Sequence, residues 1–180
     1  SSNMITRNNV FFFFYTLSSY PVNLSRSIQP SWINNTFGLS TTSEEYLSGY
    51  GSSNMQITNN LFYSIGGGGV ARNWGTHDYN AFYNSTGLPT LASHEITNLN
   101  PIWNASTNPT GSLKYITRIE SGSNLSGKGS SGGNIGATIM KMVGAQGTLW
   151  GETGYDAEQS TNMWPFPNEK LIKSKMAAYT

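Results

Sequence analysis

The side chains best suited to move protons or hold a ligand are concentrated in one short stretch, Arg-Asn-Trp-Gly-Thr-His-Asp-Tyr. Arg72, His77 and Asp78 could bind a substrate or transfer protons, because imidazole and carboxylate groups are the usual general acids and bases. Trp74 could stack on the face of a sugar ring, and the four glycines at 66–69 would let a ligand approach the backbone closely. The stretch is a candidate binding or catalytic site.

A structural explanation of this stretch is favoured over the catalytic one. In the repeat described below, His77 aligns with Ile57 and Trp32, so we expect its ring to face the core and to hydrogen-bond there. Asp78 stands just before a turn, where an Asp side chain commonly bonds to the backbone. The glycine run is a poor phosphate loop, because no Gly-Lys-Ser/Thr follows it and no helix is expected after it.

A long excursion of the chain at 39–51 carries further candidates. Glu44 and Glu45 could serve as Ca²⁺ ligands or as an acid/base pair, because adjacent carboxylates raise each other's affinity for a cation or a proton. A solvated loop is the favoured explanation, because neighbours in sequence usually point in different directions. Tyr50, in the same excursion, is a candidate ring for stacking on a sugar.

A second aromatic group lies near the C-terminus. Trp150 and Tyr155 are flanked by Glu152, Asp156 and Glu158, so rings for stacking stand beside carboxylates that could bind sugar hydroxyls. The polar exterior of a terminal segment would explain the same residues. The sequence contains neither a Ser/His/Asp order nor a His-x-x-x-His spacing, so it predicts no metal site and singles out no catalytic residue.

The composition argues against several classes of protein. A chain of 180 residues is long enough for one domain with a core. Only 11% of the residues are charged and the net charge is +1, so no field attracts nucleic acid or an anionic membrane. No window approaches the roughly 18 apolar residues of a membrane span. The absence of Cys rules out disulfides and thiolate metal sites.

The elements that position these residues come from an internal repeat. An Asn-x-Phe pattern occurs four times, with steps of 26, 25 and 20 residues between copies. A further step of 20 residues reaches Asn100 and Ile102, which predicts a fifth copy. The two columns consist of Asn9, Asn35, Asn60 and Asn80, and of Phe11, Phe37, Phe62 and Phe82.

This period, without a helical pattern between copies, predicts an all-β solenoid in which each coil lays short strands over the previous one. Asn tolerates the left-handed conformation of a sharp bend, and stacked Asn side chains can hydrogen-bond as a ladder. The Phe rings would face inward and stack, each buried ring contributing roughly 1.5–3 kcal/mol. A β-sandwich, the alternative, would not require residues to recur at a near-constant period.

The last part of the chain is expected to cap the solenoid, because an end coil exposes unpaired backbone and apolar surface. Asn168 is a candidate N-cap for a short amphipathic helix at 169–176, with Leu171, Ile172 and Met176 on one side.

The expected organisation is one domain, with coils at 1–143 and a cap at 144–180. We interpret the chain as a fragment of a longer polypeptide. No equivalent cap precedes Ser1, so further polypeptide of the same kind could stack on the N-terminal end.

Several short motifs resemble the closing coils of bacterial right-handed parallel β-helix repeat proteins of pectate-lyase-like fold. Beside the Asn-x-Phe copies, they are Asn-Pro-Ile-Trp at 100–103, Ile-Glu-Ser-Gly-Ser at 119–123 and Gly-Asn-Ile-Gly-Ala at 133–137. Gly-Thr-Leu-Trp-Gly-Glu at 147–152, followed by Leu-Ile at 171–172, is similar to a C-terminal tail seen in many of them. The loop at 123–125 lacks the Pro and the Asp that members often carry nearby.

The resemblance implies a right-handed parallel β-helix from a secreted or cell-surface protein that binds or processes polysaccharide. Polyuronate lyases of this superfamily use Ca²⁺ held by acidic side chains with an Arg or Lys base, and its hydrolases use paired Asp residues. Neither pattern can be placed in this sequence, so enzymatic activity as a polysaccharide lyase or glycoside hydrolase is left open. The alternatives are a non-catalytic adhesion module that binds glycans or neighbouring subunits, and a structural unit that assembles with other chains.

Overall fold

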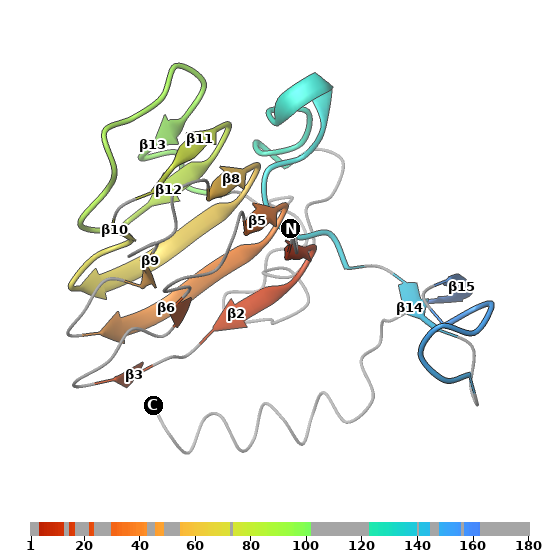
Figure 1. The fold of residues 1–180 in the computed structure, drawn as a ribbon. Helices are drawn as coiled ribbons and strands as arrows, with labels where there is room; N and C mark the ends of the chain where they lie inside the picture. The colour runs from red at the N-terminus through yellow and green to blue at the C-terminus, as the bar shows by residue number, and fades with distance from the viewer. Residues whose placement is uncertain are drawn as a thin grey trace, which may run out of the picture. The chain divides into compact units, whose positions relative to one another are not determined.

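The computed structural model divides the chain into two compact units, Ser1–Thr138 and Ile139–Thr180, and each is described here by itself. Among the described residues, the regular elements of both units are strands, apart from one 3-10 helix in the first unit (Figure 1). The residues described are 4–12, 15–16, 22–23, 30–42, 46–48, 55–72, 74–101, 123–139, 141–144, 148–155 and 157–162.

In the first unit, the strands that lie before the Asn column form a four-stranded parallel sheet. Its order is β1-β5-β8-β11, so successive copies of the repeat lie side by side. The register is that of the sequence alignment, since Thr6 pairs with Trp32, Trp32 with Ile57, and Ile57 with His77. The strands are β1 (Ile5–Arg7), β5 (Ser31–Ile33), β8 (Gln56–Thr58) and β11 (Thr76–Asp78).

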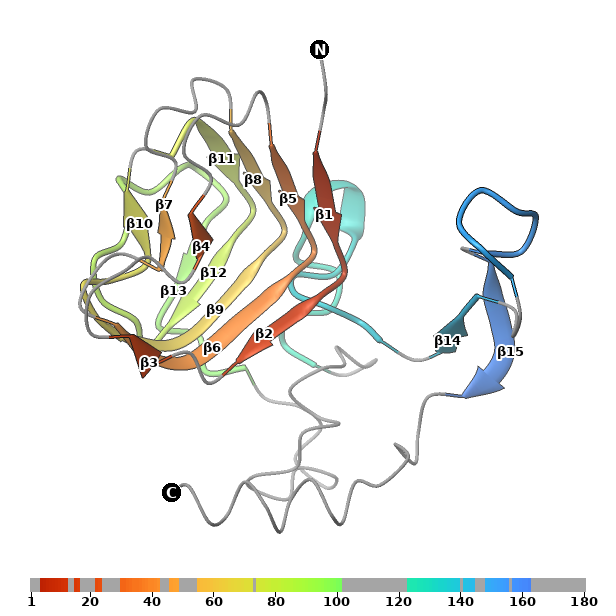
Figure 2. The same ribbon diagram turned by 60° about the horizontal axis from the view of Figure 1, so that its bottom comes forward.

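The strands that follow the Asn column form a second parallel sheet, and a third, smaller sheet lies farther along each copy (Figure 2). The second sheet has the order β13-β12-β9-β6-β2, with β3 also paired to β6, and the third has the order β10-β7-β4. The second sheet consists of β2 (Val10–Phe12), β3 (Tyr15–Thr16), β6 (Thr36–Thr42), β9 (Leu61–Gly67), β12 (Ala81–Tyr83) and β13 (Ile96–Thr97). The third consists of β4 (Val22–Asn23), β7 (Leu47–Ser48) and β10 (Ala71–Arg72).

A residue in the left-handed conformation makes the corner between the first and second sheets at every level. These residues have φ between 54° and 60°, a region that Asn adopts more readily than most other residues. Each stands one position before the Asn that sequence analysis assigned to the bend, so that assignment is corrected by one residue. The corner residues are Asn8, Asn34, Asn59 and Tyr79.

The predicted Asn ladder is confirmed, and it is formed by the residues just after the corners. The Oδ1 atom of Asn60 accepts hydrogen bonds from the backbone N–H of Asn35 at 2.8 Å and from its Nδ2 at 3.1 Å. The same pair of bonds joins Asn9 to Asn35 and Asn60 to Asn80. The ladder thus uses side-chain amides to satisfy buried backbone N–H groups at the corner.

The predicted Phe column is also confirmed and forms the centre of the core. Successive rings of Phe11, Phe37, Phe62 and Phe82 are stacked at centroid distances of 5.1, 4.9 and 5.3 Å. Residues from all three parallel sheets complete this apolar cluster. It also contains Trp32, Tyr46, Leu47, Met55, Ile57, Ile65 and Val70.

The segment 123–138 covers the outer side of the second sheet and of the corner. Leu125 and Ile135 are fully buried and pack with Leu61 and Ala81 of the second sheet. The side chains of the corner residues hold the segment by hydrogen bonds. These bonds join Asn8 to Thr138 at 2.7 and 3.1 Å, Asn34 to the Asn134 carbonyl at 2.7 Å, and Asn59 to Ser130 at 2.8 and 2.9 Å.

The predicted fold class, a right-handed parallel β-helix with a helix-containing cap, is wrong. The described strands of the first unit form parallel sheets with almost no helix, and they do not establish a closed solenoid. After β12 the chain returns directly to the second sheet as β13, without a further strand in the first or third sheet. The one described helical element is a 3-10 helix, Ser130–Gly132, and the predicted helix at 169–176 lies outside the described residues.

The predicted fifth copy is in the wrong place. The register pairs Ala81 with Ile96 and Phe82 with Thr97, so Glu95 occupies the position of the ladder Asn. Asn100 therefore does not continue the ladder column, and Ile102 lies outside the described residues. The period fails here because a Glu carboxylate supplies the acceptor that Asn supplies at the other levels.

The second unit contains an antiparallel pair of strands, β14 (Lys141–Val143) and β15 (Glu158–Asn162). Lys141 pairs with Asn162 in the register, and the Lys141 ammonium donates a hydrogen bond to the Ser160 carbonyl at 3.0 Å. The intervening residues form a loop that presents the second aromatic group. In the part of the chain that the structure describes, no helix has the length and apolarity to cross a membrane.

Candidate functional site

The Asn ladder ends at the buried carboxylate of Glu95. Its Oε1 accepts a hydrogen bond from Asn80 Nδ2 at 2.8 Å, and its Oε2 accepts one from the backbone N–H of Ala92 at 3.0 Å. The side chain of Glu95 is fully buried. Burying a carboxylate is costly unless it is paired and hydrogen-bonded, so this residue needs the partners that the ladder and the loop provide.

His77 is the ionisable side chain that contacts Glu95. Its Nδ1 lies 2.9 Å from Glu95 Oε1, and its side chain is 14% exposed. The ring also makes an edge contact with Trp74 at a centroid distance of 5.6 Å. The expectation that His77 faces inward and hydrogen-bonds there is confirmed, and its partner is a residue that sequence analysis did not consider.

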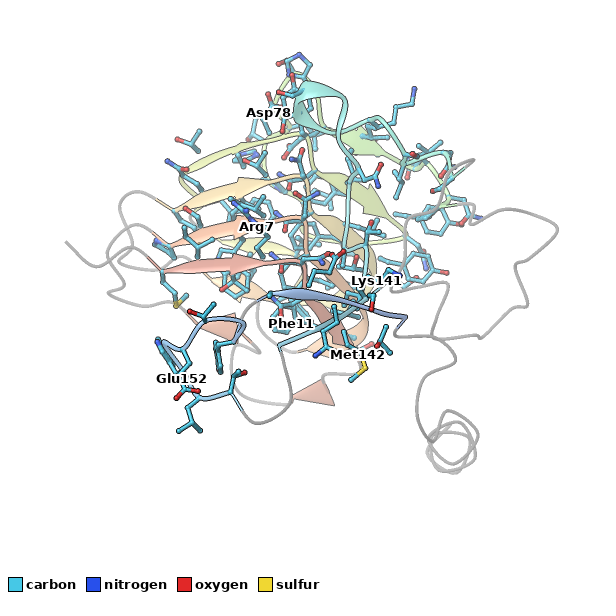
Figure 3. The ribbon with its side chains drawn as sticks, turned by 90° about the vertical axis from the view of Figure 1, so that its right-hand side faces the viewer. Arg7, Phe11, Asp78, Lys141, Met142 and Glu152 are labelled. Atoms are coloured by element: carbon cyan, nitrogen blue, oxygen red, sulfur yellow. The ribbon has the colours of Figure 1, made fainter. Side chains whose placement is uncertain are left out.

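A second His–carboxylate pair lies next to the first and is more exposed. His94 Nδ1 is 2.7 Å from Asp78 Oδ2, with side-chain exposures of 53% and 31%. The His94 ring is stacked on Tyr79 with a centroid distance of 4.4 Å and an interplanar angle of 1°. Asp78 lies at the β11 end of the stack of strands, away from Phe11 at the β2 end (Figure 3).

The environment of Asp78 favours its ionised form. Partial burial raises the pKa of Asp78, but hydrogen bonds from the His94 ring and from the backbone N–H groups of Tyr79 and His94 outweigh it, so the pKa lies below its ordinary value. The two backbone bonds measure 2.9 and 3.0 Å. The expectation that Asp78 bonds to backbone at a turn is confirmed.

The Asp78–His94 pair has part of the geometry of a general base. A carboxylate bonded to Nδ1 orients the imidazole and leaves Nε2 to exchange a proton. The hydroxyl of Ser93 also lies by Nδ1, at 3.1 Å, and not at Nε2, where a nucleophile would have to stand. The pair therefore does not form a Ser-His-Asp arrangement.

The remaining candidates of the 72–79 stretch are Trp74 and Arg72. Trp74 packs against Phe62 and Phe82, and its Nε1 donates to the Leu47 carbonyl at 3.0 Å. It is held in the core by these contacts, so its assignment as a sugar-stacking ring is not supported by its surroundings. The backbone of Arg72 lies in β10, and its side chain is outside the described part.

The candidates of the 39–51 excursion, Glu44, Glu45 and Tyr50, lie outside the described residues. The buried phenol of Tyr46, which is described, donates to the Phe11 carbonyl at 3.2 Å. Burial raises the pKa of Tyr46 well above its ordinary value, and a hydrogen bond with Ser40 opposes this only in part. Tyr46 is thus held in its protonated form as a core residue. Within the described ranges, no three His, Asp or Glu side chains are grouped to hold a metal ion.

Trp150 and Tyr155 form an exposed aromatic pair in the loop between β14 and β15. Their side chains are 88% and 45% exposed, and their rings are nearly parallel, at a centroid distance of 6.3 Å and an angle of 21°. Glu152 shapes the loop, because its Oε2 accepts from the Leu149 N–H at 2.8 Å and its carbonyl accepts from the Tyr155 N–H at 3.1 Å. Figure 3 shows the Glu152 side chain on this loop.

The backbone of the loop brings the two rings to the same place. The Glu152 N–H donates to the Leu149 carbonyl at 3.0 Å, so two consecutive turns meet at Glu152. Gly151 and Gly154 have φ of 86° and 94°, a conformation open to glycine at little cost. The other acidic candidates do not join the pair as described ligands, since Asp156 is outside the described part and Glu158 is an exposed residue of β15.

A pair of stacked tyrosines was missed by sequence analysis. Tyr63 and Tyr83 pair in the register of β9 and β12, and their rings are stacked at a centroid distance of 5.6 Å. Both are half-buried, and Tyr63 packs against the apolar cluster of Leu61 and Leu125. The signal was present, because each Tyr directly follows a Phe of the column.

We compared the chain with known proteins. No family model, curated protein or solved structure matches it. The resemblance to β-helix repeat proteins stays a prediction from short motifs, and function has to be argued from the geometry of the chain's own residues.

Proposed function

We propose that this protein binds polysaccharide through the aromatic pair Trp150 and Tyr155. The observation that carries the proposal is the exposure of Trp150, 88% of whose side chain faces solvent while its ring is held nearly parallel to that of Tyr155. Exposed apolar patches often mark binding sites. A ligand that covers the ring would gain a binding free energy of about 25 cal/mol per Å² of apolar surface buried.

The chemistry of the loop matches a sugar better than an apolar peptide. The C–H face of a pyranose can lie on an aromatic ring, and the indole N–H and phenol O–H can hydrogen-bond to its hydroxyls. Glu152 stands between the two aromatic residues in sequence and has a second carboxylate oxygen for a hydroxyl, beside the one that bonds to Leu149. A binding role of this kind suits a secreted or cell-surface protein, which is the localisation we propose.

Binding is proposed rather than cleavage. The carboxylates at the end of the stack, Asp78 and Glu95, are paired with His94 and His77. Glycoside hydrolysis needs two carboxyl groups on either side of the scissile bond, and these engaged groups do not offer that arrangement. A lyase or hydrolase activity, and a Ca²⁺ ion to support it, have no described residues to argue from.

The test is binding of the intact chain to a panel of soluble polysaccharides, including polygalacturonate, xylan and β-glucan, by affinity electrophoresis and calorimetry. We expect retention by at least one of them, and Trp150→Ala or Tyr155→Ala to weaken it by tenfold or more, as expected for loss of about 1.4 kcal/mol. Leu149→Ala is the matched control, because Leu149 is a 70% exposed apolar residue of the same loop without a ring. Failure of the chain to bind any member, or equal losses with Leu149→Ala, would refute the proposal.

A second function, assembly with other polypeptides, is supported by a different observation. Among the described strands, β1 and β2 are the outer members of their sheets, and Met4 and Ile5 are 41% and 60% exposed at this edge. An uncovered strand edge is a template for pairing with another chain. We propose that the N-terminal edge binds further β-structured polypeptide, as a non-catalytic structural or adhesion module would.

A further inference from the structure

The N-terminal edge presents groups whose equivalents at the inner levels of the stack contact the neighbouring level. Asn9 is exposed, and Phe11 is half-buried with its ring stacked on Phe37 alone among the members of its column. Arg7, at the end of β1, is also exposed. Figure 3 labels Arg7 and Phe11 on these edge strands.

The interfaces between the inner levels define what a partner of this edge must provide. From the second level on, the Nδ2 of the ladder Asn donates to a backbone carbonyl of the preceding level. That carbonyl belongs to the residue three positions before the ladder Asn of its own level. Asn35 donates to the Thr6 carbonyl, Asn60 to the Trp32 carbonyl and Asn80 to the Ile57 carbonyl, each at 2.9 Å. In return, its Oδ1 accepts the backbone N–H of the preceding Asn.

Asn9 makes neither half of this pattern, because no preceding level is described. Its Nδ2 donates to the Arg7 carbonyl of its own strand at 2.8 Å, as Asn60 Nδ2 also does to the Thr58 carbonyl at 3.1 Å. It lacks the donation to a preceding level that Asn60 adds, and no described residue donates to its Oδ1. A preceding strand would supply both a carbonyl for Nδ2 and a backbone N–H for Oδ1. In the partner, the carbonyl that accepts from Nδ2 and the N–H that donates to Oδ1 must be three residues apart. This spacing makes the requirement specific to a partner in one register.

The register adds a requirement for charge. Arg7 pairs with Ile33, Ile33 with Thr58 and Thr58 with Asp78, so every residue in this row stands two positions before a ladder Asn. A partner in the same register would place its own residue beside Arg7. An acidic side chain there would pair with the guanidinium.

A second copy of this chain does not meet these requirements at its other end. There the ladder position is occupied by Glu95, whose oxygens are already bonded to Asn80, Ala92 and His77, and the Phe position is occupied by Thr97. Head-to-tail stacking of copies would set a carboxylate in place of the required amide and leave Phe11 without a ring.

We propose that the N-terminal edge binds, in parallel, an extended segment of another polypeptide with the pattern acidic-x-Asn-x-Phe. The inference rests on the assembly function proposed above and is independent of glycan binding. The main-chain bonds and the Asn amide set the register, while the Phe ring covers Phe11 and the acidic residue pairs with Arg7. This is strand addition to a sheet edge, with side-chain columns supplying the specificity.

The probe is a synthetic peptide whose sequence is that of residues 74–83, Trp-Gly-Thr-His-Asp-Tyr-Asn-Ala-Phe-Tyr, since it carries the whole pattern. Binding of the fluorescently labelled peptide to the intact chain is followed by anisotropy. We expect saturable binding that is weakened tenfold or more by N80L in the peptide or by Asn9→Leu in the protein. Asp78→Asn in the protein is the control, because it lies at the opposite end of the stack and should leave binding unchanged.

A charge exchange tests the register independently of folding. Arg7→Glu in the protein should weaken binding of the peptide by about two- to fivefold, the range of an exposed ion pair, and D78K in the peptide should restore it. The proposal is overturned if the peptide does not bind, if Asn9→Leu binds as well as the unmodified protein, or if D78K fails to restore binding to Arg7→Glu. Self-association of the protein that blocks peptide binding would also overturn it, in favour of a second copy as the partner. Polysaccharide binding by Asn9→Leu, measured in parallel, separates a failure of this inference from a failure of the glycan proposal.

Discussion

Replacing Asn60 by Leu should destabilise the first unit far more than the same change at the exposed end of the ladder. Asn60 is fully buried, and Leu has a similar volume but no polar atom. Its Oδ1 is the acceptor for the backbone N–H of Asn35 at 2.8 Å, and its Nδ2 is a donor to the Trp32 carbonyl at 2.9 Å. Both backbone groups lose that partner in the variant.

The size of the effect follows from these two groups. Each buried polar group left without a partner costs roughly 1–3 kcal/mol. The other partners keep a bond, because Asn80 Oδ1 still accepts the backbone N–H of residue 60 at 2.9 Å and Asn35 Nδ2 still donates to Thr6 at 2.9 Å. Burial of the Leu side chain offsets about 1–2 kcal/mol. We therefore expect Asn60→Leu to lower the free energy of unfolding by about 1–4 kcal/mol.

Urea unfolding followed by circular dichroism and tryptophan fluorescence measures this difference. With a slope of about 2 kcal/mol per M, the midpoint of Asn60→Leu should fall by about 0.5–2 M. Asn9→Leu is the matched control, because Asn9 is exposed and its replacement should change the free energy of unfolding by less than about 0.5 kcal/mol. If the two variants shift the midpoint equally, the ladder does not stabilise the sheets and the reasoning fails.

Three further predictions concern other parts of the fold. Because the pKa of Asp78 lies below 3.8, the contribution of its carboxylate to stability should be complete above about pH 5 and should be lost as the pH falls through that lowered pKa. The difference in unfolding free energy between the wild type and Asp78→Asn should therefore vanish at low pH. A difference that does not depend on pH would contradict this. Phe62→Ala should cost about 3–5 kcal/mol in urea unfolding, since its ring stacks on two others, and a cost below 1 kcal/mol would contradict its place in the column. Gly69→Ala should lower the midpoint of thermal unfolding, because φ is +98° and the added Cβ would lie 2.5 Å from a backbone atom, whereas Gly66→Ala meets only a side-chain oxygen at 3.7 Å; equal midpoints would count against the close backbone contact.

The parts of the fold that sequence analysis predicted are those in which residue identities recur. The columns of Asn and Phe are confirmed because one hydrogen-bond pattern and one ring stack are repeated between identical side chains at successive levels. His77 was placed correctly for the same reason, since the register sets it beside Ile57. The period of the repeat thus predicted which residues pair between adjacent strands of the parallel sheets.

Periodicity did not determine how the sheets end. The ladder closes 15 residues after Asn80, at Glu95, which replaces an amide by a carboxylate and breaks the step of 20. The covering residues Leu125 and Ile135 come from outside the repeat, and nothing in their spacing identifies the face on which they pack. The predicted β-helix failed in these aperiodic parts, where the closing of the structure depends on contacts made far along the chain.

Candidate site residues were harder to predict, because their role depends on the solvent exposure of the side chain, which the residue type alone does not give. Trp74 and Trp150 are the same residue type beside Gly, but one donates its N–H to a core carbonyl and the other is 88% exposed. Likewise, Asp78 was a candidate acid on its own, whereas its partner His94 lies 16 residues away and had not been considered.

Copies that resemble one another also allow errors during folding. A chain that slipped by a whole level would still place amide on amide and phenyl on phenyl, so the repeated columns alone distinguish the native pairing poorly from such a trap. The residues that differ from level to level carry that information: Trp32, Ile57 and His77 occupy equivalent positions with different volumes, and only His77 can meet the carboxylate at the last level. Making those three positions alike would be expected to leave the Asn and Phe columns intact and yet yield a mixture of registers.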